Sequence, residues 1–189
     1  LVGLPFVRAL WVLDTGGGII ADSDRGNIGV SLADRDYFRV FKARPETRFF
    51  LGAPVRSRSI GSWLISAAYP LHDSKGALVG VLAAALEPPY FESLWAEIDL
   101  GQEGRIELYR QDGTLMASSL SPNVVLGVKT SDTAIKAVIS GVTDSGDPPL
   151  LIQSAAHGRM VLGERLERYP QLTLVAQRSW GEVLAPWRK

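Results

Sequence analysis

The sequence predicts an α+β fold built from two similar modules in tandem, and two observations lead to this prediction. The first is an internal repeat: "GGGIIADS" (16–23) matches "DGTLMASS" (112–119), and "IGVSLAD" (28–34) matches "LGVKTSD" (126–132). The second is that strand-like and helix-like segments follow one another in the same order in both halves. Because the repeated stretches keep their order and nearly their separation, they indicate a duplicated domain.

In the first half, a Gly-rich turn at 15–18 separates two short apolar stretches, which is typical of a β-hairpin. The stretch 31–43 has Phe38 and Phe41 at helical spacing, and Asp34 or Ser31 is available as its N-cap. A proline opens the helical pattern that closes this half. The predicted elements are strands at 9–14 and 19–23, a helix at 31–43, strands at 48–55, 62–71 and 77–86, and a helix at 88–98.

The second half repeats this order, with its hairpin turn at Asp112-Gly113. Five antiparallel strands with a helix between the second and third fit a PAS-like α+β module, so we expect two such modules, each with a five-stranded sheet flanked by helices. The boundary is predicted between residues 98 and 99. The expected elements are strands at 104–110 and 114–118, a helix near 131–140, strands near 149–155, 159–167 and 171–178, and a helix from Trp180.

Composition excludes several classes of function. Twenty basic residues balance twenty acidic ones, so no domain-wide basic surface exists to neutralise phosphates, and we expect no nucleic-acid partner. There is no cysteine, and the only histidines are His72 and His157. A thiolate or histidine metal centre and a Ser-His-Asp arrangement are therefore hard to assemble. We expect no metal, no cofactor and no catalytic residues in this chain.

The longest apolar run, residues 76–86, has 11 residues. A membrane-spanning helix needs about 20 apolar residues, so this run is better explained as a buried strand. The chain begins with Leu1 rather than methionine. We therefore expect it to be a piece of a longer protein, whose other parts could include membrane helices.

The stretch "DRDYF" (34–38) is the main candidate for a binding site. One interpretation is a charged helix start, in which Asp34 caps the helix and Asp36 favours its dipole. The second copy keeps Asp132 but continues with "TAIK", so it retains the cap and loses the arginine and both aromatic residues. An arginine beside Tyr37 and Phe38 suits a pocket that grips a carboxylate or stacks on a planar ligand. The comparison of the copies favours a site that contains Arg35.

The opposite wall is expected from the third and fourth strands of the first half. Side chains alternate between the two faces of a strand, so Trp63 and Tyr69 share a face that Ser66 does not. Arg56 and Arg58 are either part of the site or solvated loop charges. The predicted ligand-binding residues are Arg35, Tyr37, Phe38, Arg58, Trp63, Ser66 and Tyr69.

These motifs together resemble a known family. The runs "DRDYF", "YPLHDSKGALVGVLAAALEPPYFESLW" and "GRIELYRQDGTLMASS", and the tail "GRMVLGERLERYPQLTLVAQRSWGEVLAPWRK", are similar to double Cache domains. These tandem PAS-like (PDC) sensor domains occur on membrane-bound bacterial diguanylate cyclases and sensor histidine kinases. The resemblance implies a periplasmic domain between two transmembrane helices. It also implies a long first helix, of which residues 1–7 would be the end.

The resemblance further implies that module 1–98 is membrane-distal and binds a small molecule, and that module 99–189 is membrane-proximal and leads into a transmembrane helix. The expected function is a non-enzymatic sensor domain, acting as a homodimer, which controls a cytoplasmic diguanylate cyclase or histidine kinase. The arginine favours a carboxylate or another small anion as ligand. The amino-acid-binding pattern of some double Cache domains is not matched here. The alternative is a ligand-free module for protein interaction or dimerisation.

Overall fold

A computed structural model describes residues 4–24, 26–57, 61–120, 123–142, 149–154 and 158–187. Two of the residues considered above, Arg58 and His157, lie outside these ranges. Contacts between Cα atoms divide the chain into two compact units, Leu1–Pro88 and Pro89–Lys189. The division falls about ten residues before the boundary expected from the sequence, because the helix that begins at Pro88 groups with the second unit.

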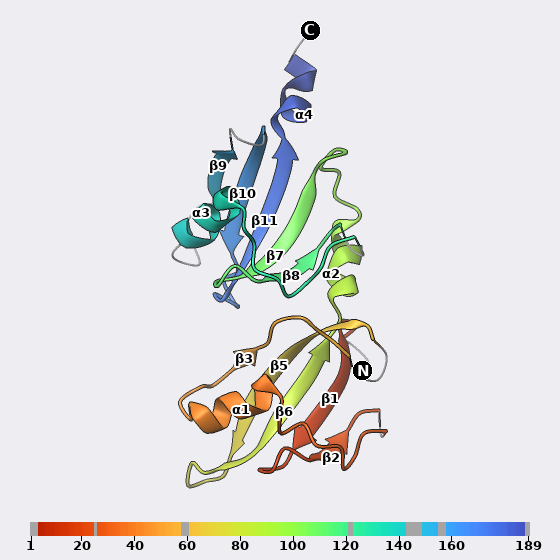
Figure 1. Ribbon diagram of the computed structural model, residues 1–189, viewed down its shortest axis with the longest axis vertical. Helices are drawn as coiled ribbons and strands as arrows, with labels where there is room; N and C mark the ends of the chain where they lie inside the picture. Colours follow the sequence, from red (N-terminus) through yellow and green to blue (C-terminus); the bar gives the residue numbers. More distant parts are fainter. Residues whose placement is uncertain are drawn as a thin grey trace. The chain divides into compact units, whose positions relative to one another are not determined.

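The first unit is an antiparallel sheet with one helix on one face (Figure 1). The order of its strands is β2-β1-β6-β5-β3, and the short strand β4 pairs with β5 outside this path. The first and last long strands of the unit, β1 and β6, are therefore neighbours at the centre. The elements are β1 (Val7–Leu13), β2 (Ile19–Asp22), α1 (Asp36–Ala43), β3 (Phe50–Leu51), β4 (Val55–Arg56), β5 (Trp63–His72) and β6 (Leu78–Leu86).

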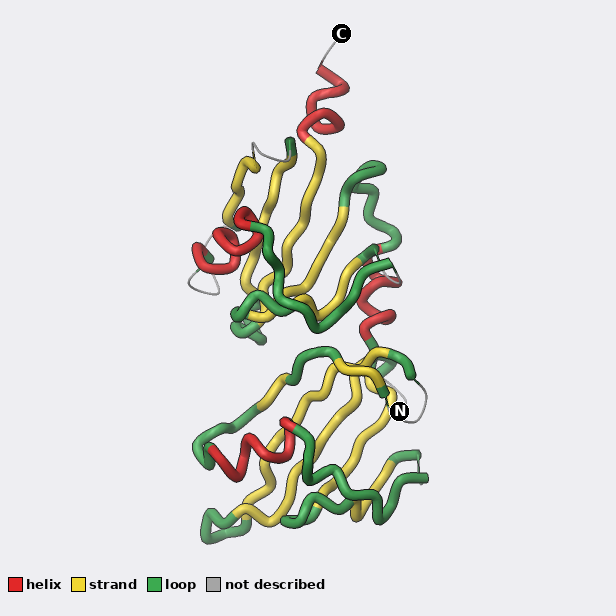
Figure 2. Tube along the Cα trace, viewed as in Figure 1, coloured by secondary structure: helices red, strands yellow, loops and turns green. Residues whose placement is uncertain are grey.

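Helix α1 lies in front of the sheet in the view of Figure 2 and closes the core of this unit. Phe38 and Phe41 are each only 2% exposed, and they pack with Leu13 and Val81 of the sheet. Full burial of a side chain of this size contributes about 1.5–3 kcal/mol. The core therefore fixes α1 on the sheet, and with it the loop that leads into the helix.

The strand expected at 48–55 is two short strands, because the chain leaves the sheet at Gly52. The backbone N–H of Gly52 donates to the carbonyl of Ser66 at 2.7 Å, and a Cβ at Gly52 would clash with the Ser66 hydroxyl. Pro54 then has no N–H to donate to a ladder. Strand β4 then pairs antiparallel with the start of β5, with Arg56 opposite Trp63.

The second unit repeats the architecture in its sheet order, β8-β7-β11-β10-β9. This confirms the predicted α+β fold of two PAS-like modules, although the first sheet has the additional strand β4. Within the described ranges, no helix is long and apolar enough to cross a membrane. The elements are α2 (Pro88–Trp95), β7 (Arg105–Arg110), β8 (Leu115–Ser118), α3 (Thr133–Gly141), β9 (Leu150–Ser154), β10 (Arg159–Arg165), β11 (Leu172–Ser179), α4 (Trp180–Leu184) and a final 3-10 turn (Ala185–Trp187).

The internal repeat seen in the sequence is also a repeat of hydrogen bonds. An isolated bridge joins Gly18 to Ser31 in the first unit, and the matching bridge joins Thr114 to Lys129 in the second. In both hairpin turns a glycine adopts a positive φ, 87° at Gly17 and 83° at Gly113. The predicted duplication is therefore confirmed down to single backbone contacts.

The two helices that follow the hairpins begin differently. Asp132 is the N-cap of α3, and its carboxylate accepts hydrogen bonds from the N–H groups of Ala134 (2.9 Å) and Ile135 (3.2 Å). In α1 the N-cap residue is Arg35, which forms no side-chain cap. The expectation that Asp34 or Ser31 caps α1 is wrong, because the helix starts at Asp36 and its N-cap position is therefore Arg35.

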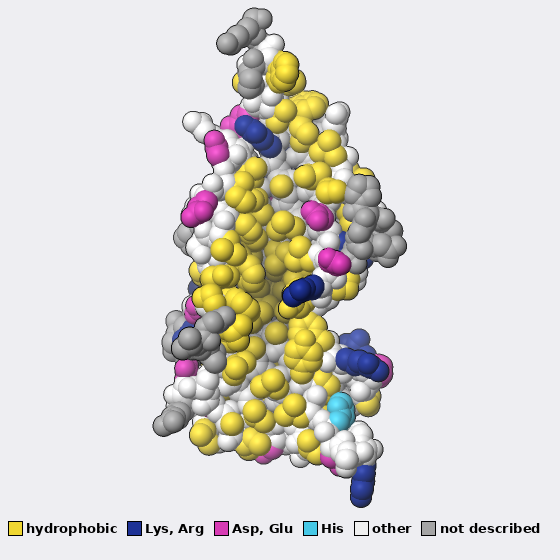
Figure 3. Space-filling model, turned by 180° about the vertical axis from the view of Figure 1, so that it is seen from behind, with side chains coloured by type: hydrophobic (Ala, Val, Ile, Leu, Met, Phe, Trp, Pro, Cys, Tyr) yellow, Lys and Arg dark blue, Asp and Glu magenta, His cyan; other side chains and the backbone are white. Residues whose placement is uncertain are grey.

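The sheet face opposite the helices carries apolar side chains in each unit. Figure 3 shows this face from behind, with hydrophobic side chains over both sheets. Tyr69 is 50% exposed, and Leu151 and Leu162 are 48% and 40% exposed. Because side chains alternate between the faces of a strand, Tyr69 points to the face opposite to Ser66. In the second unit, Leu151 and Leu162 likewise point to the face opposite to Gly163, which lies against α3.

Candidate ligand-binding site

A cavity of about 280 Å³ lies in the first unit, between the sheet and the segments that enclose it. Its floor comes from β1, β5 and β6, and its walls come from β2, the loop before α1, the first turn of α1, and β4. Ser66 and Ala85 are direct cross-strand partners on the floor, and their small side chains leave the space open. The lining residues are Trp11, Ile19, Asn27, Val30, Leu32, Arg35, Tyr37, Val55, Arg56, Ser57, Leu64, Ser66 and Ala85.

Two hydrogen-bond donors of residues that line this cavity have no acceptor among the described residues. The indole Nε1 of Trp11 and the guanidinium Nε of Arg35 are both buried from solvent and lack a hydrogen-bond partner there. No ion pair of Arg35 occurs within the part of the chain that the structure describes. A buried donor without an acceptor costs about 1–3 kcal/mol, and more when it is charged. This arrangement is unfavourable for the empty protein and suited to a ligand that carries acceptors.

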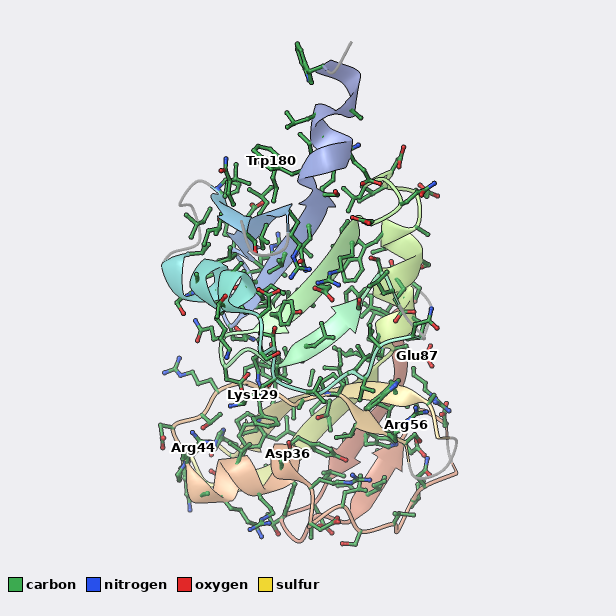
Figure 4. The ribbon with its side chains drawn as sticks, turned by 45° about the horizontal axis from the view of Figure 1, so that its top comes forward. Asp36, Arg44, Arg56, Glu87, Lys129 and Trp180 are labelled. Carbon is green, nitrogen blue, oxygen red and sulfur yellow. The ribbon has the colours of Figure 1, made fainter. Side chains whose placement is uncertain are left out.

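A second arginine lies at the rim of the cavity. The guanidinium carbon of Arg56 lies 4.7 Å from the centre of the Trp63 ring, and its Nη1 donates to the carbonyl of Gly61 at 2.9 Å. Figure 4 labels Arg56 on β4 and Asp36 at the start of α1. The ring and the carbonyl hold the Arg56 guanidinium beside Trp63, on the face of β5 opposite to Ser66.

Asp22, the last residue of β2, stabilises the wall of the cavity on the β2 side. Its carboxylate accepts hydrogen bonds from the backbone N–H of Asp24 (2.9 Å) and from both the N–H (2.9 Å) and the side-chain amide (2.8 Å) of Asn27. Partial burial alone would raise the pKa of Asp22, but these hydrogen bonds outweigh it, and the pKa lies below its ordinary value. The ionised Asp22 thereby orients Asn27 at the cavity.

The cavity contains three of the residues predicted from the sequence, Arg35, Tyr37 and Ser66. Phe38 does not line it, because it is buried in the core beneath α1. Trp63 and Tyr69 do not line it either, because they lie on the opposite face of β5, where they stack on Arg56 and Phe49. Arg58 lies outside the described residues. Sequence reasoning missed Trp11, although strand alternation in 9–14 placed it on the same face as the buried Leu13.

In the second unit a cavity of about 310 Å³ is lined by Leu115 and Val128, the counterparts of Ile19 and Val30, and a hydrogen-bonded pair takes the place of Trp11 and Ala85. Glu107 takes the place of Trp11, and its carboxylate accepts hydrogen bonds from the Gln177 amide (2.6 Å) and the Tyr109 hydroxyl (3.1 Å). Arg105 donates to Gln177 at 3.1 Å, and its Nε lies 3.5 Å from the Glu107 carboxylate. Burial and the Glu107 charge raise the pKa of Tyr109 above its usual value. Glu107 and Gln177 are thereby paired within the second unit, whereas the Arg105 Nε, like the Arg35 Nε, is buried without a hydrogen-bond partner among the described residues.

No cluster of three potential metal ligands occurs among the described residues. His72 is exposed at the end of β5. The cavity contains a hydroxyl-bearing Ser66 but no histidine or carboxylate that could activate it.

Comparison with solved structures shows which proteins share this fold. The extracellular domain of a protein named as a histidine kinase, rpHK1S-Z16, has a TM-score of 0.78 and 26% identity, over 97% of this chain and 75% of the other. The ligand-binding domain of Mlp24, solved with asparagine, has a TM-score of 0.63 and 15% identity, over 97% and 72%. That of the Pseudomonas fluorescens chemoreceptor CtaA, solved with L-isoleucine, has a TM-score of 0.65 and 15% identity, over 95% and 72%.

No protein-family model matches the sequence, and no curated protein matches it. The structural neighbours are extracellular sensor domains and ligand-binding domains of receptors rather than catalytic domains. The fold of this chain is therefore that of an extracytoplasmic sensor domain with two PAS-like modules.

Proposed function

We propose that this chain is the periplasmic sensor domain of a bacterial membrane receptor, and that it binds a small molecule in the cavity of its first unit. The observation that carries the proposal is the pair of unpartnered donors, Trp11 Nε1 and Arg35 Nε, in one cavity. A ligand that accepts from both would remove the cost of leaving them unsatisfied. The binding residues of this proposal are Arg35, Tyr37, Ser66 and Trp11.

The contrast between the units supports the first one as the sensing module. The two units share a strand order and a hairpin geometry, so both have a space between the sheet and the helix. In the second unit Glu107 and Gln177 bind each other and do not line the cavity of that unit, whereas their counterparts Trp11 and Ala85 line the cavity of the first. In this proposal the second unit is the membrane-proximal relay.

The ligand would act by shifting the population of conformations of the first unit. Arg35 and Tyr37 belong to the start of α1, and Val55 and Arg56 belong to β4, so one ligand contacts both enclosing segments and the sheet floor. The response is limited by the difference in affinity for the two states. Transmembrane helices outside this chain would carry the change to a cytoplasmic histidine kinase or diguanylate cyclase, in a homodimer with two-fold symmetry.

A thermal-shift screen tests the proposal. The domain is heated with a panel of carboxylates, amino acids, amines and purines, alongside the Arg35→Ala variant and a matched Arg39→Ala control from the exposed face of the same helix. A ligand present at a hundred times its Kd adds about 2.7 kcal/mol of stability. We expect a compound that stabilises the wild type and the Arg39 variant, but not the Arg35 variant.

The alternative function, a ligand-free module for protein interaction, is favoured by the apolar sheet faces on which Tyr69 and Leu162 are exposed. The same thermal-shift screen distinguishes ligand binding from the interaction function. If the folded domain responds to no compound and Arg35→Ala melts like the wild type, the cavity is not a sensing site and the interaction function is preferred.

A further inference from the structure

The charges around the cavity are all of one sign. Arg35 and Arg56 line it, and no aspartate or glutamate does so within the described residues. Two stretches adjacent in sequence to lining residues fall outside the described ranges, residue 25 and residues 58–60, and these read R and RSI, without an acidic residue.

The acidic residues near the lining in sequence are engaged elsewhere, and Glu87, which follows Ala85 by two residues, lies 3.9 Å from the Arg8 Nε. The Asp22 carboxylate accepts three hydrogen bonds from Asp24 and Asn27. Asp34 and Asp36, on either side of Arg35, line a separate hollow with Arg39. In addition, Asp36 Oδ1 accepts from the Tyr37 N–H at 2.8 Å. The cavity therefore offers donors and positive charge to a ligand, and only neutral acceptors.

We infer that the cavity selects small carboxylates with an apolar body and without an ammonium group. The inference rests on the proposed function and adds the ligand class. The carboxylate would accept from Trp11 Nε1 and Arg35 Nε, as charge-assisted hydrogen bonds. An α-ammonium group would lose its water in the same space, beside an arginine and with no carboxylate to compensate it.

The rest of the lining fits an aliphatic or aromatic body. Ile19, Leu32 and Leu64 are apolar wall residues, and Val30 and Val55 lie at the exposed rim. A volume of about 280 Å³ lies at the lower end of small-molecule sites, which span roughly 300–1,000 Å³. Branched-chain and phenyl-substituted short carboxylates suit this volume and this lining.

Matched pairs of compounds test the inference by isothermal titration calorimetry on the whole domain. The pairs are 3-methylbutanoate with valine, 4-methylpentanoate with leucine, and 3-phenylpropanoate with phenylalanine, which differ only in the α-ammonium group. The amine 3-methylbutylamine and the neutral 4-methylpentanamide complete the set. Each compound is also titrated into Arg35→Gln and Arg39→Gln.

We expect at least one carboxylate to bind, with its amino acid weaker by at least about 100-fold and the amine without detectable binding. The amide should be weaker than its acid by about tenfold or more, and Arg35→Gln should remove this difference whereas Arg39→Gln should not. An amino acid that binds as well as its carboxylate, or a carboxylate series without binding, overturns the inference.

The broader thermal-shift panel distinguishes a failure of the inferred ligand class from a failure of the proposed ligand-binding site. If an amine, amino acid or purine stabilises the wild type and loses its effect in Arg35→Gln, the cavity is a ligand site of another class, and only the inference fails. If a carboxylate binds and Arg35→Gln does not weaken it, its binding lies elsewhere and both proposals fail.

Discussion

Trp11 of β1 and Glu107 of β7 hold the same position in the two sheets, opposite Ala83 of β6 and Val175 of β11. Glu107 is hydrogen-bonded within its own unit, whereas the indole N–H of Trp11 has no acceptor among the described residues. The two copies of the scaffold thus differ at this position, where one carries a paired carboxylate and the other an unsatisfied donor.

Removing the Arg35 guanidinium should abolish binding without destabilising the empty domain. Arg35 Nε has no partner to lose, so Arg35→Met removes a charge that the described part of the protein does not compensate. We expect a melting temperature equal to or above that of the wild type without ligand. Arg159→Met is the matched control, because it takes the partner from Asp132 and should lower stability. A destabilised Arg35→Met would show that Arg35 has a structural role.

Trp11→Phe keeps an aromatic ring on the cavity floor, removes its N–H donor and makes the side chain smaller. A hydrogen bond to a charged group is worth about 1.5–3 kcal/mol. We therefore expect at least tenfold weaker carboxylate binding by calorimetry, with little change in the melting temperature of the empty domain. Unchanged affinity in this variant would remove Trp11 from the site.

The cap of α3 combines two roles of Asp132 that substitutions can separate. Asp132→Ala removes both the cap and the pair with Arg159, and losing an N-cap alone costs about 0.5–2 kcal/mol. Asp132→Asn keeps an oxygen that can accept from the Ala134 N–H. Urea unfolding should therefore rank the variants wild type, Asn, Ala in falling stability. Equal losses in both variants would mean that the ion pair, and not the cap, is responsible.

The two hairpin glycines should differ in their tolerance of alanine. Both adopt a positive φ, which costs an alanine about 1–2 kcal/mol. At Gly17 the new Cβ would also lie 2.7 Å from the Ala33 Cα, whereas at Gly113 its nearest neighbour is Thr130 Cγ2 at 3.6 Å. Overpacking adds about 1–3 kcal/mol, so Gly17→Ala should be the more destabilised variant in urea unfolding. Similar losses would contradict the close approach of Ala33.

Acid should weaken the hairpin turn of the second unit. The Arg110 guanidinium, with further hydrogen bonds from Thr114, holds the pKa of Asp112 below its usual value. A lowered folded pKa stabilises the protein above the unfolded value of about 3.9, and this contribution is lost as the pH falls below it. Asp112→Asn should lower the melting temperature modestly at pH 7, because the carboxylate is partly exposed, and the difference should shrink below about pH 4. A difference that stays constant with pH would contradict this explanation.

Much of the fold could be predicted from the sequence, because it depends on local patterns. The repeat around Gly17 and Gly113 indicates the duplication, and the structure shows the same backbone bridges in both units. The start of α1 could not be predicted, since the match of Asp34 to Asp132 suggests a shared cap. The two helices begin at different points relative to that aspartate, and this difference makes Arg35 the N-cap residue of α1.

The site could be predicted only in part, because it depends on which strands become neighbours. The Arg35 cluster is visible in the sequence, and strand alternation correctly separates Ser66 from Trp63 and Tyr69. The alternation does not tell which face of β5 points into the cavity. Pairing of β1 with β6, far apart in sequence, brings Trp11 to the cavity, and no local pattern encodes that.

Nuclear magnetic resonance of the tryptophan indole groups tests the central claim most directly. The chain has five tryptophans, and the indole N–H resonance of Trp11 can be assigned from its loss in Trp11→Phe. We predict that titration with 4-methylpentanoate shifts the Trp11 indole proton downfield as it gains an acceptor, with smaller changes at Trp63 and Trp95. If no carboxylate of the matched pairs moves the Trp11 resonance, or if one binds and moves only the others, the cavity of the first unit is not the carboxylate site.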